Sequence, residues 1–221
     1  MNKAIASIIT VGAFIGVFSC SSTMDSTNEK TEKYKVPAVD RTSYGKLDTA
    51  YFASGCFWAV EGIFDSLKGV KEAESGYSGG NTRNPTYREV SNETTGHAET
   101  VAVYYDPKII SYATLLEVYF ASQDPTQVNG QGPDHGDSYR SVIFYSNAEE
   151  QKSATDYKNK LAASGKYKKP IAVQIVPFKA FYKAEAYHQN YDQHHADEPY
   201  VASVSIPRIE RAQAMFPKLL K

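Results

Sequence analysis

The sequence contains two cysteines, and one of them, Cys56, lies where a thiol could act as a nucleophile. It belongs to the pentapeptide SGCFW at 54–58, between a strand-like run that ends at Ala53 and an amphipathic helix expected over 57–67. At a helix N-terminus, unpaired backbone N–H groups and the helix dipole favour thiolate over thiol. Cys56 is therefore a candidate nucleophile. The alternative is a small buried apolar residue at a helix start.

Five short motifs accompany this thiol along the chain. They are GCFW at 55–58, GYSGG at 76–80, NPTYREV at 84–90, GHAE at 96–99 and DHGDSYRS at 134–141. Their order and spacing resemble those of the A-type peptide methionine sulfoxide reductases, and the resemblance covers roughly residues 49–191. Any one motif is weakly specific, whereas five in register are strongly so. The resemblance implies a reductase of the S epimer of methionine sulfoxide, free or in proteins, without a metal or organic cofactor.

The resemblance also implies roles for the residues that carry it. Cys56 would attack the sulfoxide sulfur and become a sulfenic acid. Glu99 would give a proton to the sulfoxide oxygen, which is a poor leaving group until it is protonated. Tyr87 and Tyr139 would hydrogen-bond that oxygen, provided that their hydroxyls converge on Cys56. Without such convergence they are half-buried packing residues.

Three further residues would hold the substrate. Phe57 and Trp58 would form an apolar wall around the substrate methyl group. Asp134 would help to hold the substrate backbone and the surroundings of the thiol. Because Asp134 lies in a glycine-rich loop, turn formation is the alternative role.

The position of Glu99 suits an acid independently of the resemblance. Residues 97–105 read as a strand, in which Glu99 points to the same face as Val101 and Val103. An apolar setting disfavours the carboxylate and raises its pKa, which keeps the proton available. A strand-end carboxylate in solvent is the alternative.

The five histidines do not have the spacing of a zinc site, and we expect surface or packing roles for His188, His194 and His195. We expect His97 and His135 to support Glu99 and Asp134 by hydrogen bonding.

Two other functions remain open. One is a Cys/His thiol hydrolase in which Cys56 attacks and His97 or His135 is the base. It is disfavoured because a hydrolase would need the carboxylate of GHAE to orient the base, not to act as the acid. The other is a non-catalytic envelope binding module with a tyrosine-rich groove, since the sequence contains 17 tyrosines.

Regeneration of the thiol is expected to need a partner. No cysteine follows Cys56, and Ser91 occupies the loop position where some members of the family carry a recycling cysteine. A sulfenic acid on Cys56 should therefore persist until an external thiol attacks it, from a thioredoxin-like protein or a small dithiol. The C-terminal region 198–221 matches the family loosely, so its substrate contacts are not assigned.

Strand-like and helix-like segments alternate after residue 48, which predicts an α/β (α+β) two-layer sandwich with a mixed central sheet, of ferredoxin-like type. Ser146 and Glu149 are expected to form a capping box at the start of a helix that ends at Ser164. Strands are expected over 49–53, 70–77, 97–105, 139–145 and 171–176, and the other helices over 57–67, 112–121 and 184–194.

The first 47 residues predict a targeting signal followed by a polar tether. An apolar stretch over 4–18, too short for a comfortable membrane span, precedes Ser19 and Cys20. We expect residues 1–19 to be a signal peptide, Cys20 to be lipidated, residues 20–47 to be a polar tether and residues 48–221 to be the catalytic domain. A secretory leader, an uncleaved anchor or an extra strand within the tether are the alternatives. Lipidation would anchor the protein in the bacterial cell envelope.

Composition argues against nucleic-acid binding. The chain of 221 residues is 42% apolar, which suffices for one core, and its formal net charge of −1 offers no basic surface for nucleic acid. We expect a monomer that acts on oxidised proteins or free methionine sulfoxide.

Overall fold

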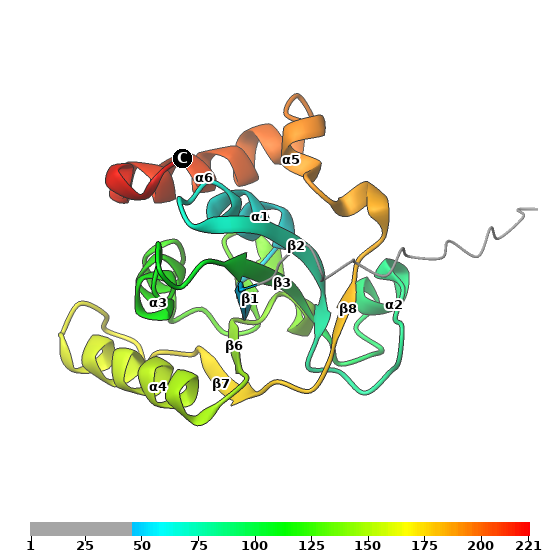
Figure 1. The fold of residues 1–221 in the computed structure, drawn as a ribbon. Helices are drawn as coiled ribbons and strands as arrows, with labels where there is room; N and C mark the ends of the chain where they lie inside the picture. The colour runs from blue at the N-terminus through cyan, green and yellow to red at the C-terminus, as the bar shows by residue number, and fades with distance from the viewer. Residues whose placement is uncertain (1–45) are drawn as a thin grey trace, which may run out of the picture. The chain divides into compact units, whose positions relative to one another are not determined.

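A six-stranded mixed sheet organises residues 46–221, the part of the chain that this computed structural model describes (Figure 1). Its strand order is β7-β6-β1-β3-β2-β8, in which β6 and β7 run parallel and the other neighbours run antiparallel. The strands are β1 (Asp48–Ala53), β2 (Val70–Ser78), β3 (Ala98–Tyr105), β6 (Val142–Tyr145), β7 (Gln174–Pro177) and β8 (Phe181–Lys183).

Helices connect these strands and follow the last of them. They are α1 (Phe57–Asp65), α2 (Tyr87–Ser91), α3 (Tyr112–Ala121), α4 (Ala148–Ala163), α5 (Tyr191–His194) and α6 (Ile206–Met215). A small hairpin of β4 (Gly130–Gln131) and β5 (Asp134–His135) lies between α3 and β6. A π-helical turn over Val201–Ser205 leads into α6.

The connectivity confirms the predicted ferredoxin-like sandwich. Strands β1 and β3 occupy the centre, with β2 and β6 on either side of the pair. Because β1 and β2 both run antiparallel to β3, α1 joins two parallel strands across a third, and α3 joins β3 to β6 in the same way. These are two split βαβ units.

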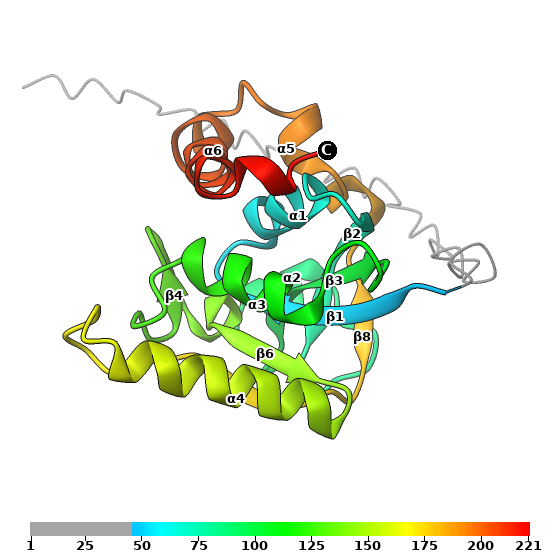
Figure 2. The same cartoon turned by 60° about the vertical axis from the view of Figure 1, so that its left-hand side comes forward.

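Both helices of these units cover one face of the sheet (Figure 2). The ring of Phe52, fully buried on β1, stacks with Phe64 of α1 and Tyr119 of α3, each at 5.1 Å between ring centroids. The opposite face carries a second apolar cluster that includes Tyr51, whose ring stacks on Phe178 at 3.9 Å. Both faces of β3 are therefore buried, which places Glu99 in the interior.

Helix α4 begins one residue later than predicted. The side chain of Asn147, rather than Ser146, accepts the capping hydrogen bond, from the Glu150 backbone N–H at 2.9 Å. The Glu150 carboxylate accepts from the Ser146 N–H at 2.7 Å, so Glu150 takes the place expected for Glu149. An asparagine oxygen is as good a cap as a serine hydroxyl, and the sequence pattern fits both registers.

Three predicted strands are longer than the observed ones. Strand β3 begins at Ala98 rather than at residue 97, and β6 begins at Val142 because Asp137–Tyr139 form a 3-10 turn. Strand β7 begins at Gln174, since the buried residues before it enter the core without joining the sheet.

The predicted helix over 184–194 is wrong. A 3-10 turn over Ala186–His188 and the short helix α5 take its place, separated by Asn190 in the left-handed conformation with φ of 53°. Elements α2, β8 and α6 were not predicted, and Leu67, expected in the first helix, instead forms a bridge with Leu220.

The predictions for residues 1–19, for Cys20 and for most of the tether concern residues outside the described part of the chain. Within residues 46–221, no helix has both the length and the apolarity to cross a bilayer.

Candidate active site

Cys56 lies at the N-cap of α1, directly after the turn that leaves β1. Gly55 makes this turn with φ of +68°, and a Cβ there would lie 2.5 Å from Cβ of Gln131. A glycine is therefore required both by the backbone conformation and by the close approach of the β4 segment. The prediction that the nucleophile candidate stands at a helix start is confirmed.

The resting state of Cys56 differs from the prediction. The residue is 7% exposed, and burial, followed by the charge of Glu99, raises the pKa of its thiol well above the ordinary value. The Trp58 backbone N–H and the Tyr200 hydroxyl act in the opposite direction and do not prevail. The expectation that the helix start favours the thiolate is thus wrong for the free protein, because the helix N-terminus does not outweigh desolvation.

Glu99 is buried beside this thiol. Its side chain is 2% exposed, and its Oε2 accepts a hydrogen bond from the Phe57 backbone N–H at 3.0 Å. Burial raises the pKa of Glu99 to about 8 against the opposing effect of that N–H. A carboxyl group that stays protonated at neutral pH therefore lies next to the residue that follows Cys56, as the strand pattern predicted.

Tyr87 and Tyr139 share these surroundings. Burial, followed by the charges of Glu99 and Cys56, raises the pKa of the Tyr87 hydroxyl to about 12. Burial and the charge of Glu99 raise the pKa of Tyr139 further. Both phenols remain protonated donors at neutral pH and lie close enough to feel the charges of the thiol and the carboxyl. The convergence of the two hydroxyls on Cys56 itself stays a prediction.

Asp134 lines the same cavity as the thiol. Its Oδ2 accepts a hydrogen bond from the Tyr200 hydroxyl at 2.6 Å, and burial raises its pKa. Tyr200 was not predicted as a site residue. Its segment lacks a recognisable motif, so only the folded structure brings it to Asp134 and Cys56.

The two aromatic residues predicted to form the apolar wall have different surroundings. Phe57 is 1% exposed and belongs to the core, whereas Trp58 is partly buried at its edge. The indole N–H of Trp58 donates to His188 Nδ1 at 3.1 Å. The ring of Tyr191 stacks on the indole, with 3.8 Å between the ring centroids. His188 is fully buried and burial lowers its pKa to about 4, so the expected packing role is confirmed for this histidine.

The predicted hydrogen bonds of the two other histidines are wrong. His97 Nδ1 accepts from the Gly80 N–H at 3.0 Å, and its Nε2 lies 2.9 Å from the Thr82 carbonyl oxygen. It therefore fixes the turn after GYSGG rather than Glu99. His135 is exposed, and Asp134 receives its hydrogen bond from Tyr200 instead. With both nitrogens of His97 engaged, this histidine is not placed as the base of a thiol hydrolase.

Arg208 of α6 holds the turn that precedes the nucleophile. Its guanidinium donates to the Ser54 carbonyl oxygen at 2.8 Å, to Ser54 Oγ at 2.8 Å and to the Ser122 carbonyl oxygen at 3.1 Å. No sequence signal pointed to this residue, because it lies 154 positions from Ser54 in the chain.

A cavity of about 810 Å³ opens beside Cys56. Its walls come from the end of α3, the β4–β5 hairpin and α6, with Asp134, Tyr200, Arg208 and Met215 among them. Within residues 46–221, no group of three or more His, Cys, Asp or Glu side chains is arranged to hold a metal ion.

These contacts place a buried carboxyl group and two tyrosine hydroxyls in the surroundings of a thiol at a helix start, an arrangement suited to thiol chemistry. Comparison with known proteins gives the family. The family model described as peptide methionine sulfoxide reductase matches residues 48–219. The peptide methionine sulfoxide reductase MsrA of Picrophilus torridus is 46% identical over 169 residues, which are 76% of this chain and 95% of that protein.

Two solved structures agree with this result. Mxr1 from Saccharomyces cerevisiae in reduced form matches with a TM-score of 0.64 and 32% identity, over 68% of this chain and 87% of that one. Methionine sulfoxide reductase A of Corynebacterium diphtheriae matches with a TM-score of 0.62 and 34% identity, over 69% and 76%. The chain belongs to the peptide methionine sulfoxide reductase family. It is an oxidoreductase that reduces methionine sulfoxide at the expense of a thiol.

Proposed function

We propose that this chain reduces the S epimer of methionine sulfoxide, free or in proteins, with Cys56 as the nucleophile and Glu99 as the acid. The observation that carries this assignment is the buried Glu99, whose Oε2 is bonded to the backbone N–H of the residue after Cys56 and whose pKa is raised to about 8 by burial. A proton held there is available to a sulfoxide oxygen bound above the thiol.

The reaction balances on these groups. As Cys56 attacks the sulfoxide sulfur, Glu99 gives its proton to the sulfoxide oxygen, and the proton from the thiol replaces it on the Glu99 carboxylate. That oxygen then passes to the cysteine sulfur, and the S–O bond of the substrate breaks. Methionine leaves, its sulfur reduced by two electrons, and Cys56 is oxidised to a sulfenic acid. Tyr87 and Tyr139 donate hydrogen bonds to the oxygen, while Trp58 packs on the substrate methyl group.

An external thiol then reduces the sulfenic acid. The sequence contains no cysteine after Cys56, and Ser91, where the family can carry a recycling thiol, ends helix α2. We infer a thioredoxin-like protein or a small dithiol as the reductant. Its thiolate attacks the Cys56 sulfur, water leaves, and a second thiol of the reductant releases Cys56 by disulfide exchange.

A single turnover of the full chain tests this sequence of steps. The chain is mixed with the S epimer of N-acetyl methionine sulfoxide without reductant, and a sulfenic-acid reagent then traps the product. One adduct at Cys56 for each methionine formed is expected, with no turnover of the R epimer. Methionine formed without a Cys56 adduct would overturn the nucleophile assignment. Hydrolysis of a p-nitrophenyl ester would favour the thiol hydrolase, and activity on neither compound would favour the binding module.

We also propose that Cys20 is the lipidated N-terminus of the mature protein and that the substrates are oxidised proteins of the bacterial envelope. The apolar stretch over 4–18, the following Ser19 and Cys20, and the polar stretch that leads to the catalytic domain support this proposal. Two or more acyl chains on Cys20 would hold the protein firmly, since one chain gives marginal binding. Mass spectrometry of the mature N-terminus tests it, and an unmodified N-terminus or recovery in the soluble fraction would count against it.

A further inference from the structure

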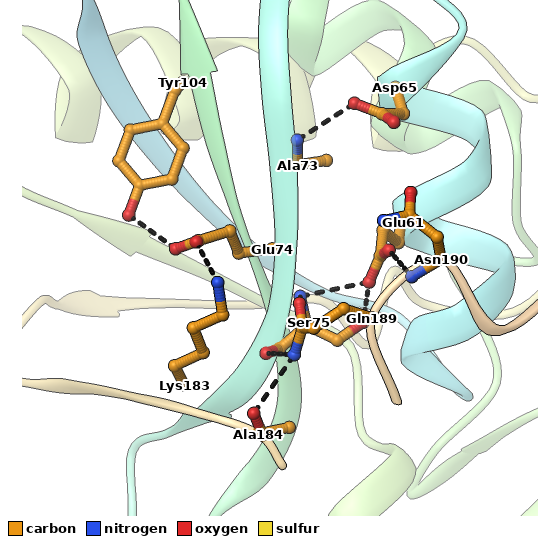
Figure 3. Close-up of polar contacts among 10 residues, drawn as sticks. All are labelled: Glu61, Asp65, Ala73, Glu74, Ser75, Tyr104, Lys183, Ala184, Gln189 and Asn190. Atoms are coloured by element: carbon orange, nitrogen blue, oxygen red, sulfur yellow. Dashed lines mark hydrogen bonds and ion pairs between the residues drawn. The ribbon is translucent and has the colours of Figure 1, made fainter. Parts of the chain in front are cut away.

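Glu61 is a buried carboxylate that takes no part in the reaction proposed above. It lies one helical turn after Trp58 on α1 and is 2% exposed. Its Oε2 accepts from the Ser75 backbone N–H at 3.1 Å and from the Ser75 hydroxyl, while its Oε1 accepts from the Asn190 backbone N–H (Figure 3). Three donors from β2 and from the segment 188–191 therefore converge on one side chain.

The segment 188–191 holds the indole of Trp58 in place. His188 accepts the indole N–H, and the ring of Tyr191 lies parallel to the indole, within 9°. Asn190 separates these two residues and adopts a left-handed backbone conformation that non-glycine residues rarely take. Because Glu61 binds the N–H of Asn190 itself, the carboxylate fixes the turn that sets both contacts with Trp58.

A second side chain fastens the same segment to β2. Gln189 donates from Nε2 to the Ser75 carbonyl oxygen at 3.0 Å and to the Ala184 carbonyl oxygen at 3.1 Å. Its Oε1 accepts from the Ser75 N–H at 3.1 Å. Ser75 is thus the point on β2 to which both Glu61 and Gln189 are tied (Figure 3).

We propose that Glu61 is a positioning residue for the substrate pocket. By holding Asn190, it keeps His188 and Tyr191 against Trp58 and so sets the wall on which the substrate methyl group packs. This inference rests on the substrate-binding role of Trp58 in the proposed function. Glu61 itself acts through the protein and not on the substrate.

Glu61→Gln tests the proposal with almost no change of volume. The amide offers one acceptor oxygen in place of two, so either Ser75 or Asn190 faces an NH₂ group. Glu74→Gln is the matched control. Glu74 is an equally buried carboxylate of β2, on the opposite side of the strand, and binds the Tyr104 hydroxyl and Lys183 (Figure 3).

The sequence contains a single tryptophan, so intrinsic fluorescence reports on Trp58 in the full chain. We expect Glu61→Gln to shift Trp58 emission and to raise KM for N-acetyl methionine sulfoxide by about fivefold to tenfold, with kcat changed less than about twofold. Glu74→Gln is expected to lower thermal stability without changing the emission or KM. Unchanged emission and KM in folded Glu61→Gln would overturn the proposal.

A double-mutant cycle with Trp58→Phe separates this inference from the proposed function. If Glu61 acts through Trp58, Glu61→Gln should raise KM by less than about twofold in the Trp58→Phe background. An equal loss in both backgrounds would overturn the inference while leaving the proposed function intact. Wild-type kinetics of Trp58→Phe would instead overturn the proposed wall, and the inference with it.

Gln189→Ala, which loosens the same segment, is the second variant should Glu61→Gln fail to fold. Unchanged KM and Trp58 emission in Gln189→Ala would also overturn the proposal.

Discussion

Glu99→Gln should have opposite effects on two reactions of Cys56. Burial raises the pKa of Glu99 to about 8, so about ten carboxyls are protonated for each ionised one at pH 7, and the ratio is inverted at pH 9. Since the charge of Glu99 also raises the pKa of the thiol, thiolate forms more easily while Glu99 is protonated. Gln resembles the protonated carboxyl in size and polarity but has no proton to give.

For the sulfoxide, the reactive form combines a thiolate with a protonated Glu99. Its population rises with pH while Glu99 keeps its proton. Above pH 8, the gain in thiolate and the loss of acid cancel, so kcat/KM of the wild type should level off near that pH. Glu99→Gln should reduce kcat/KM by about 100-fold or more and should show no such levelling.

Alkylation by iodoacetamide needs the thiolate but no acid. Wild type and Glu99→Gln should therefore react at similar rates near pH 7. At pH 9, the variant should react up to about tenfold faster, because about ten of eleven wild-type chains then carry an ionised Glu99. Peptide mapping by mass spectrometry separates alkylation of Cys56 from that of Cys20. Near wild-type sulfoxide reduction, or slower alkylation of the variant at pH 9, would refute the assignment of Glu99.

Three further substitutions probe the surroundings of the site. Arg208→Met should destabilise the fold by about 1 to 3 kcal/mol in urea denaturation, because the acceptors on Ser54 and Ser122 lose their donors; the exposed Arg211→Met is the control, and equal losses would contradict the role of Arg208. Tyr200→Phe should slow the alkylation of Cys56 at every pH, because the hydroxyl lowers the pKa of the thiol, and an unchanged rate would show that it does not. Gly76→Ala should lower the melting temperature, because its Cβ would lie 2.4 Å from Phe181 Cζ and 2.5 Å from the Tyr182 carbonyl oxygen. Overpacking of this kind costs about 1 to 3 kcal/mol. A wild-type melting temperature would mean that β8 shifts to relieve these contacts without a loss of stability.

The parts of the site that belong to regular local patterns were predictable from the sequence. Gly55 and Cys56 follow a strand and precede a helix, and Glu99 shares a face with apolar neighbours on β3, so spacing alone placed the thiol and indicated a raised pKa for the carboxyl. The ionisation of Cys56 was not predictable in this way, because it depends on the burial produced by the whole fold. Desolvation and the Glu99 charge exceed the local influence of the helix start.

The site residues of the C-terminal region could not be predicted from the sequence for a different reason. Arg208 and Tyr200 reach the site from segments that carry no motif, and their partners lie far away in the chain. Asn190 interrupts a stretch whose composition suits a helix, and this left-handed residue donates its backbone N–H to Glu61, 129 positions away in the chain. Long-range contacts of this kind override local propensity, which is why helix 184–194 was wrong while α3 was predicted to the residue.

The depth of Cys56 has a consequence for the proteins on which this enzyme acts. With 7% of the residue exposed, an oxidised methionine must project from its own backbone to reach the sulfur. A sulfoxide that lies flush with the surface of a folded client must first be released by local opening of that client. We therefore expect the repair rate of such a site to follow the client's opening equilibrium, so that hydrogen-exchange protection around a methionine would rank how quickly its oxidation is reversed.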